Sequence, residues 1–208
     1  MKKYLGEFIG SFFLTLSLVL TLSNPATVAW APLAAGLLLM ALIPAGKTYS
    51  EAHFNPAITL AALMRGKIDR TDALYYVVAQ LAAGVAAAAI GAYLHQCGNG
   101  AEVIPRLQEQ ALCTIIVEFL GVFALAFVAL NVSTDGSAKT GMALGAAQAA
   151  LMFALGGLSG GAFNPAVALG TSVAGLIHFG DLLLYLTGNV FGAAAAATVV
   201  QLLEKTPD

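Results

Sequence analysis

The chain has 208 residues, of which 59% are hydrophobic and 10% are charged, and its mean hydropathy is +0.85. A soluble domain carries about 25% charged residues, so this composition excludes a soluble globular protein and indicates an integral membrane protein. The net charge of −2, without any basic patch, argues against nucleic-acid binding. The two cysteines, Cys97 and Cys113, form no metal-ligand pattern and are expected to be unpaired thiols near one membrane surface.

The first apolar segment, Leu5–Leu22, has two interpretations. Met1-Lys2-Lys3 precedes it, and Ala29-Trp30-Ala31 has the small-x-small form of a signal-peptide cleavage site. However, Glu7 interrupts the apolar run and recurs as Glu118 in the second half of the chain. We therefore interpret this segment as a retained first membrane span.

A membrane-spanning helix needs about 20 mostly apolar residues, and six segments approximately meet this requirement. In chain order they are Leu5–Leu22, Val28–Ala45, Ala73–Leu94, Leu112–Leu130, Gly141–Leu158 and Leu182–Leu203. The connections between them are short except for His95–Ala111, which joins the two halves of the chain. The predicted fold class is an all-α membrane protein with six transmembrane helices.

Two further apolar segments, after the second and the fifth span, are too short to cross a bilayer. They begin with the same four residues, Phe54-Asn55-Pro56-Ala57 and Phe163-Asn164-Pro165-Ala166. Asn is a strong N-cap, and Pro suits the first helical position because no backbone donor is lost there. Each copy therefore predicts a re-entrant half-helix that begins at its Asn. Such a helix start is tolerated in a bilayer only where it is buried in protein or lines a wet cavity.

The two copies belong to an internal repeat. They lie 109 positions apart, and this offset also relates Gly36 to Gly145, Asp72 to Asp181, Tyr76 to Tyr185 and Gln80 to Asn189. An offset of 111 relates Glu7-Phe8-Ile9-Gly10 to Glu118-Phe119-Leu120-Gly121. We expect one domain, 1–208, made of two halves, approximately 1–98 and 110–208. Three spans per half make the halves inverted, and the matching interrupted helices indicate a site at their interface near the midplane.

Lysine and arginine are distributed unequally between the two ends of the predicted spans. With the N-terminus inside the cell, the cytoplasmic ones are Lys2, Lys3, Lys47, Arg65, Lys67, Arg70, Lys139 and Lys205. Only Arg106 lies outside in this arrangement. The positive-inside rule therefore predicts a multi-pass protein of the cell (inner or plasma) membrane with cytoplasmic N- and C-termini.

At the two Asn-Pro-Ala motifs and the repeat around them, the chain resembles the aquaporin and aquaglyceroporin family, the major intrinsic proteins. The resemblance covers essentially the whole chain. It implies six tilted transmembrane helices, two half-helices that meet at their Asn-Pro-Ala starts, and a pore through each subunit of a homotetramer. The implied partners are the lipid bilayer, water and small neutral solutes, and no cofactor, metal, nucleic acid or catalytic residue is expected.

Asn55 and Asn164 are the first candidate pore residues. Each side-chain amide has two N–H donors, so both amides face one passing oxygen if the half-helices meet at the midplane. The alternative is that each Asn only caps its helix. The two roles are compatible, because the carbonyl oxygen can cap the helix while the NH2 group faces the pore. Two positive helix ends at the centre would also form a barrier to cations, including protons.

The resemblance implies a ladder of backbone carbonyls along the pore. By register these belong to Glu51, Ala52, His53 and Phe54 in the first half and to Gly160, Gly161 and Ala162 in the second. Two of these residues have a further interpretation: His53 as a packed residue that supports the loop, and the Phe54 side chain, with that of Phe163, as packing beside the pore. Glu51 departs from the small residues usual in the family. It places a negative charge near the cytoplasmic mouth, where Lys47 is a possible partner.

Glu7 and Glu118 lie within predicted spans, where an unpaired carboxylate would be costly. The resemblance implies that they accept hydrogen bonds from the re-entrant loops and so fix the half-helices. A proton relay is the alternative, although no further intramembrane acid or base accompanies either residue.

The most informative position is a departure from the family pattern. Most members have an Arg directly after the second Asn-Pro-Ala, as one wall of the outer constriction, whereas this chain has Val167. By family register the other three walls are Ala35, Met152 and Gly161. Together these four residues predict an opening that is wide, uncharged and largely apolar.

The predicted function is therefore a passive, bidirectional channel for small neutral solutes and water. The solutes in question are glycerol-like polyols, urea, and metalloid hydroxides such as arsenous acid. A strict water channel is the alternative within the family. An ion-coupled secondary transporter is the alternative from another class, because such transporters also use inverted repeats and broken helices.

Overall fold

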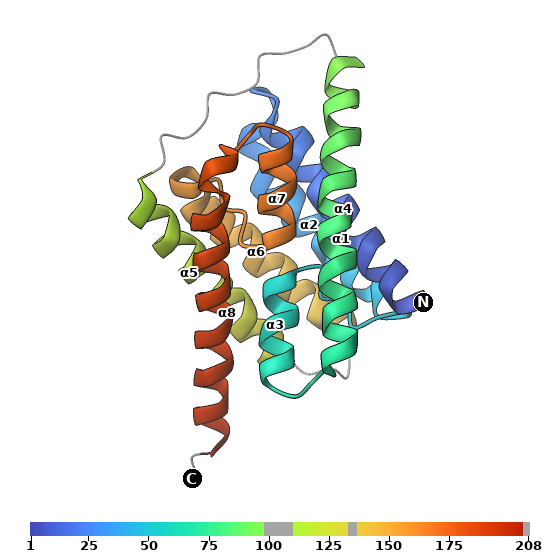
Figure 1. Cartoon of the computed structure of the whole chain (residues 1–208), viewed down its shortest axis with the longest axis vertical. Coiled ribbons are helices and arrows are strands. Elements are labelled where there is room, and N and C mark those ends of the chain that lie inside the picture. The colour runs from blue at the N-terminus through green and yellow to red at the C-terminus, as the bar shows by residue number, and fades with distance from the viewer. Residues whose placement is uncertain (98–109, 133–136, 206–208) are drawn as a thin grey trace.

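The computed structural model describes residues 1–97, 110–132 and 137–205, so Arg106 and most of the connection between the halves lie outside the described residues. Within these ranges six helices are long and apolar enough to cross a membrane, which confirms the predicted spans (Figure 1). They are α1 (Lys2–Leu22), α2 (Ala31–Gly46), α4 (Arg70–Cys97), α5 (Ala111–Asn131), α6 (Ser137–Ser159) and α8 (Leu182–Lys205). Short 3-10 turns, η1 (Val28–Trp30) and η2 (Phe179–Asp181), lead into α2 and α8.

The two short helices are α3 (Pro56–Met64) and α7 (Pro165–Val173), each of nine residues. At about 1.5 Å per residue each covers about 13 Å, less than half of a hydrocarbon core about 30 Å thick. In both, the preceding Asn adopts an extended backbone and the Pro occupies the first turn. In Figure 1, α7 lies above α3, so the two half-helices occupy opposite halves of the molecule.

The helices of the two halves pack in matching ways. In the first half α1 packs on α4, and in the second half α5 packs on α8. Each half-helix also contacts the last helix of the other half, α7 with α4 and α3 with α8. The halves meet along α2 and α6, where a Cβ added at Gly36 would lie 2.5 Å from the Gly145 carbonyl oxygen, and one at Gly145 equally close to that of Gly36. These two glycines therefore set the close approach of the helices.

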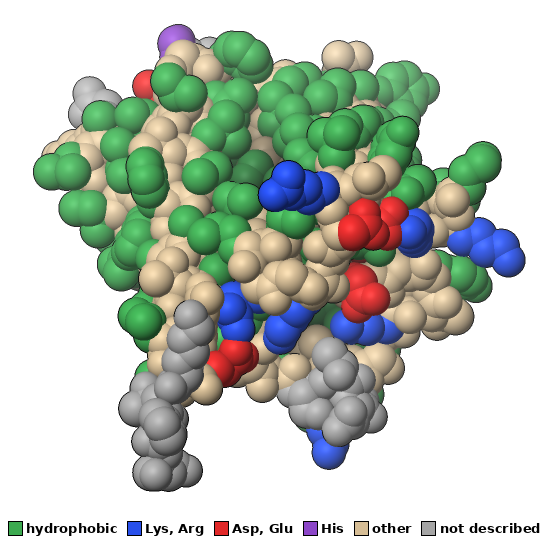
Figure 2. All heavy atoms as spheres, turned by 60° about the horizontal axis from the view of Figure 1, so that its bottom comes forward, with side chains coloured by type: hydrophobic (Ala, Val, Ile, Leu, Met, Phe, Trp, Pro, Cys, Tyr) green, Lys and Arg blue, Asp and Glu red, His purple; other side chains and the backbone are tan. Residues whose placement is uncertain are grey.

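Charged side chains gather on one end of the described molecule. Figure 2 shows Lys, Arg, Asp and Glu side chains gathered on the face that comes forward from the bottom of Figure 1, while the sides are largely hydrophobic. We call this the charged face; it contains the start of α4, the end of α3 and the end of α8. On it Lys3 pairs with Asp72, and Arg65 pairs with Glu204. An apolar belt below a charged rim is the surface that a bilayer requires.

Candidate functional site: two cavities joined at paired helix starts

Two cavities approach the half-helix starts from opposite sides of the molecule. The wide cavity has a volume of about 420 Å³ and is lined by the ends of α1 and α6, the start of α2, and α7 with its flanking loops. The narrow cavity has a volume of about 90 Å³ and extends from Lys47 and Lys67 to Asn55 and Asn164. The two cavities therefore lie on either side of the paired half-helix starts.

Asn55 and Asn164 each make two kinds of hydrogen bond. The Asn55 Oδ1 accepts from the Ala57 backbone N–H at 2.9 Å, and the Asn164 Oδ1 accepts from the Ala166 N–H at the same distance. Each carboxamide also donates through Nδ2 to the opposite loop, Asn55 to the Phe163 carbonyl and Asn164 to the Phe54 carbonyl, both at 2.8 Å. One N–H of each amide remains for another acceptor.

These cross-links have a consequence for the carbonyl ladder proposed from the sequence. The Phe54 carbonyl is occupied by Asn164 and holds the two half-helix starts together. Only one lone pair of this carbonyl oxygen therefore remains to accept a hydrogen bond from a passing molecule. The Phe54 ring is fully buried and its edge fills the space above Gly10, just as the Phe163 ring fills the space above Gly121.

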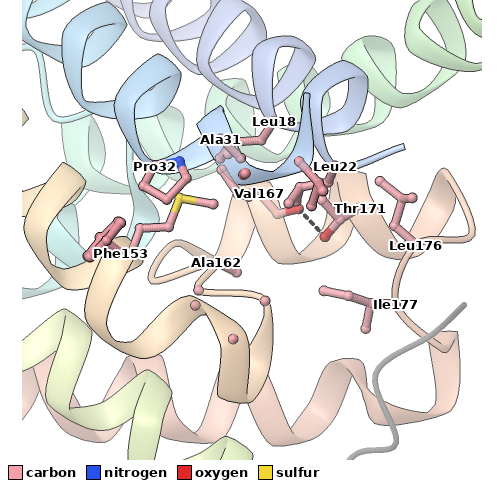
Figure 3. Close-up of a pocket in the computed structure, with 17 residues that line it drawn as sticks. Leu18, Leu22, Ala31, Pro32, Phe153, Ala162, Val167, Thr171, Leu176 and Ile177 are labelled. Atoms are coloured by element: carbon pink, nitrogen blue, oxygen red, sulfur yellow. Dashed lines mark hydrogen bonds between the residues drawn. The ribbon is translucent and has the colours of Figure 1, made fainter. Parts of the chain in front are cut away.

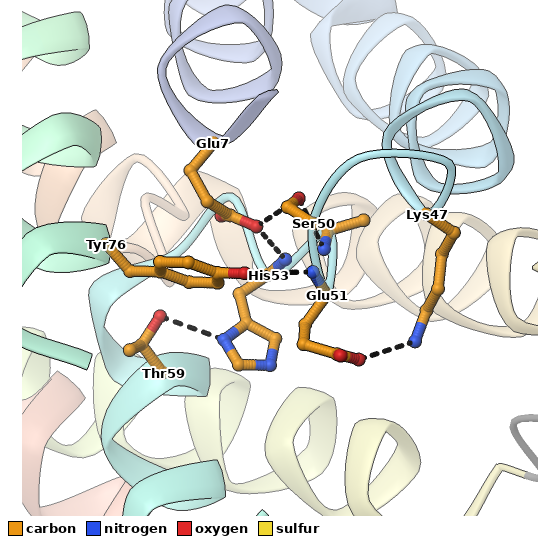
Figure 4. A network of polar contacts seen from close by, with 8 residues as sticks. Glu7, Lys47, Ser50, Glu51, His53, Thr59 and Tyr76 are labelled. Atoms are coloured by element: carbon orange, nitrogen blue, oxygen red, sulfur yellow. Dashed lines mark hydrogen bonds and ion pairs between the residues drawn. The ribbon is translucent and has the colours of Figure 1, made fainter. Parts of the chain in front are cut away.

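Glu7 positions the first loop. Its carboxylate is fully buried and accepts hydrogen bonds from the His53 N–H at 3.0 Å and the Phe54 N–H at 2.7 Å. It also accepts from the Ser50 hydroxyl at 2.7 Å (Figure 4), and from the Gln80 amide at 2.8 Å. Four donors from α4 and the loop therefore satisfy one buried carboxylate.

Glu118 makes the matching set of contacts in the second half. The fully buried carboxylate accepts from the Ala162 N–H at 3.0 Å and the Phe163 N–H at 2.8 Å. The Ser159 hydroxyl and the Asn189 amide complete the set at 2.9 Å and 2.7 Å. Because both carboxylates are saturated by fixed donors, neither offers a free group to a passing proton or ion.

Both loops contain residues in the left-handed region of the backbone. Ala52 and Phe54 have φ values of 53° and 50°, and the matched Gly161 and Phe163 have values of 65° and 45°. This conformation costs roughly 1–2 kcal/mol for a residue with a Cβ. The hydrogen bonds to Glu7 and Glu118 hold the loops in this left-handed conformation. Successive carbonyl groups of the loops therefore do not point along one axis as they do in a helix.

The structure brings three of the four predicted filter residues together. Met152, Gly161 and Val167 all line the wide cavity, and Gly160 and Ala162 line it as well. Val167 and Ala162 are seen at this cavity in Figure 3. Ala35 does not line it; the residue is fully buried, directly before Gly36 at the α2–α6 contact. The α2 residues that reach this cavity are Ala31 and Pro32, about one turn earlier along the helix.

Sequence reasoning missed the apolar stripe on α1. Leu18 and Leu22 line the wide cavity and Leu14 lines the narrow cavity, so the stripe passes from one to the other. The sequence contains the pattern that predicts this stripe, because these leucines recur every four residues and therefore share one face of a helix. The repeat offset of 111 also carries Leu14 to Leu125, which lines the narrow cavity from α5.

The narrow cavity carries the charges and the histidine. The Lys47 Nζ lies 3.5 Å from a carboxylate oxygen of Glu51, and the Lys67 Nζ donates to the Leu130 carbonyl at 2.7 Å. The His53 Nδ1 is 3.1 Å from the Thr59 Oγ1, and its ring meets the Tyr76 ring edge-on at 5.6 Å (Figure 4). His53 therefore supports the loop and lines the cavity at once.

The whole chain matches known proteins. A family model described as "Major intrinsic protein" matches residues 1–141 and 108–207. The chain belongs to the major intrinsic protein family. It is accordingly a multi-pass membrane protein and a passive channel for water and small solutes.

Individual members of the family are similar to this chain over nearly its full length. "Glycerol uptake facilitator protein-like 6" of Lactiplantibacillus plantarum is 32% identical, with 95% of each chain covered. "Aquaporin NIP1-4" of Oryza sativa subsp. japonica is 31% identical over 100% of this chain and 79% of the relative. The aquaglyceroporin from Plasmodium falciparum superposes with a TM-score of 0.83 over 99% of both chains at 19% identity, so it shares the fold.

Proposed function

We propose that this channel conducts neutral solutes larger than water, together with water itself. The classes are glycerol-like polyols, urea, and metalloid hydroxides such as arsenous acid. The observation that carries the proposal is the wide cavity of about 420 Å³, whose described lining residues include no ionisable side chain. Met152, Gly161 and Val167 leave space there that a long or charged side chain would fill. The name of the Lactiplantibacillus plantarum relative, a glycerol uptake facilitator-like protein, is consistent with this substrate class.

The pore runs between the half-helix starts and excludes ions there. The N-termini of α3 and α7 meet through the two Asn amides, which places two positive dipole ends at one point. A neutral solute loses little at this point, whereas a cation is repelled and receives no carboxylate in return. The remaining N–H of each amide is the donor for a passing hydroxyl or water oxygen.

The channel is made of two inverted repeats, approximately 1–98 and 110–208, and works as a homotetramer in the cell membrane with both termini in the cytoplasm. The matched contacts of Glu7 with Glu118 and of Gly36 with Gly145 support the repeats. The lysines and arginines of the charged face support a cytoplasmic position for that face.

Stopped-flow light scattering on proteoliposomes tests the proposal directly. Glycerol, urea and arsenous acid should all enter faster than into protein-free liposomes, with rates that rise linearly with concentration. Flux of water alone would support the strict water channel instead. Saturable flux that requires a Na⁺ or H⁺ gradient would support the secondary transporter.

A further inference from the structure

The narrow cavity contains the repeat counterparts of the four filter positions. The offset of 109 relates Ala35 to Leu144, Met152 to Ile43, Gly161 to Ala52 and Val167 to Ile58, and all four counterparts line the narrow cavity. Three of these counterparts carry the larger side chain of their pair. At two of these pairs, Gly161 with Ala52 and Val167 with Ile58, both residues line a cavity and the larger one lies in the cavity of about 90 Å³ rather than the one of about 420 Å³. Close contact between solute and protein therefore occurs in the narrow cavity.

An ion pair stands at the end of the narrow cavity away from the asparagines. Lys47 follows the last residue of α2, and Glu51 lies four residues on in the re-entrant loop. The two side chains point toward each other in Figure 4, and they are 21% and 56% exposed. The Tyr76 hydroxyl accepts a hydrogen bond from the Glu51 N–H at 3.1 Å, so α4 fixes the backbone that carries the carboxylate.

We propose that the Lys47–Glu51 ion pair is a second selectivity determinant of this channel and favours solutes with adjacent hydroxyl groups. The proposal rests on the conduction of neutral solutes proposed above. An ammonium donates to one hydroxyl oxygen while the carboxylate accepts from the neighbouring hydroxyl, so a vicinal diol binds both partners at once. The described lining of the wide cavity contains no charged donor and acceptor side by side.

The ion pair should let the channel distinguish between two solutes of the same size that differ in the spacing of their hydroxyl groups. A diol entering a tight cavity loses hydrogen bonds to water, and that loss is costly unless the protein replaces them. 1,2-Propanediol and 1,3-propanediol have the same atoms and nearly the same volume, but only the first has adjacent hydroxyls. The native channel should therefore conduct the 1,2 isomer faster.

The experiment measures both isomers, glycerol and water in the same proteoliposomes, after subtracting the flux of protein-free liposomes. Lys47→Met and Glu51→Gln should each lower the ratio of 1,2 to 1,3 flux by about two- to fivefold, the scale expected for a partly exposed ion pair. The double variant Lys47→Glu with Glu51→Lys exchanges the two charges and should restore most of the ratio. Water flux should change little in all of them.

Glu204→Gln is the matched control. It removes the partner of Arg65 on the same charged face, and neither residue lines either cavity. An isomer ratio that stays at the native value in both single variants overturns the proposal, and so does an equal change in Glu204→Gln, which would reflect general surface charge. Native proteoliposomes that conduct water but none of the three alcohols would instead overturn the proposed function, and this inference with it.

Discussion

At the scale of single residues, the proposed solute selectivity rests on the residue directly after the second Asn-Pro-Ala. Val167 is 1% exposed and lines the wide cavity from the first turn of α7, with the Gly161 backbone in the same lining. A short, uncharged side chain there leaves the cavity open. We therefore propose that this residue sets how much space a solute has before it reaches the asparagines.

Val167→Arg should reduce glycerol and arsenous acid flux at least tenfold while reducing water flux much less. The guanidinium would occupy space that Val leaves open and would add donors that suit water. Stopped-flow rates normalised to folded protein check this, because a buried cation without a prepared partner also lowers stability. Equal rates for the larger solutes in the variant and the native channel would mean that Val167 does not border the path.

Asn164→Asp should impair solute flux and weaken cation exclusion. An ionised Asp cannot donate to the Phe54 carbonyl, which now receives the Asn164 amide at 2.8 Å, and it brings negative charge between two positive helix ends. Ser172→Ala in the same half-helix is the control, since within the described part of the chain the Ser172 hydroxyl has no hydrogen-bond partner. Flux and K⁺ leak that match the native protein in the folded Asp variant would rule out a role in the pore.

Glu118→Leu should destabilise the protein strongly and Glu118→Gln much less. Leu leaves the Ala162 and Phe163 N–H groups unpaired in a buried site, at about 1–3 kcal/mol each. Gln keeps one acceptor oxygen for the loop. Thermal unfolding in detergent measures the difference, and two variants with the same midpoint would show that the carboxylate does not hold the loop.

At the scale of elements, the halves are joined by two helices in unusually close contact. The α2 and α6 backbones approach at Gly36 and Gly145, where an added Cβ would lie 2.5 Å from a carbonyl oxygen. Backbone atoms cannot swing aside as a flexible side chain can, so the helices themselves must separate to admit a methyl group. The filter is affected as well, because Met152 lies two turns after Gly145 on α6.

Gly145→Ala should therefore lower stability by about 1–3 kcal/mol, the usual scale of overpacking in a well-packed contact. Gly157→Ala on the same helix is the control, because nothing lies within 4 Å of an added Cβ there. Midpoints of thermal unfolding in detergent compare the two. A Gly145→Ala variant as stable as Gly157→Ala would show that the contact is loose.

At the scale of the whole molecule, the charged face can lie on either of the two sides of the membrane. Helix α4 has 28 residues; it begins at Arg70 on the charged face and ends at the exposed Cys97 on the opposite side (Figure 1). Positive residues retained in the cytoplasm would place Cys97 outside the cell.

A membrane-impermeant maleimide should label Cys97 in intact cells carrying Cys113→Ala. A Lys67→Cys variant that also lacks both native cysteines should be labelled only after the cells are permeabilised. The reverse pattern would mean that the charged face is outside.

The sequence by itself determined the class, the six spans, the two half-helices and the residues at their starts. Composition excludes a soluble protein, and an Asn-Pro pair favours a helix start wherever it occurs in a chain. Both features can therefore be predicted without knowledge of the tertiary structure. Helices α4 and α6 are longer than the predicted spans, because polar residues such as Arg70 and Ser137 begin the helix before the apolar run starts.

Only the tertiary structure decided which side chains border the cavities. The cross-links from Asn55 to Phe163 and from Asn164 to Phe54 join residues more than 100 positions apart, and no local pattern contains them. Family register placed Ala35 at the filter, whereas Ala31 and Pro32, about one turn earlier on the same face of α2, line the wide cavity. The depth at which a side chain meets a cavity depends on packing against partners distant in the chain, which is why the sequence could name the half-helices but not the full lining of the two cavities.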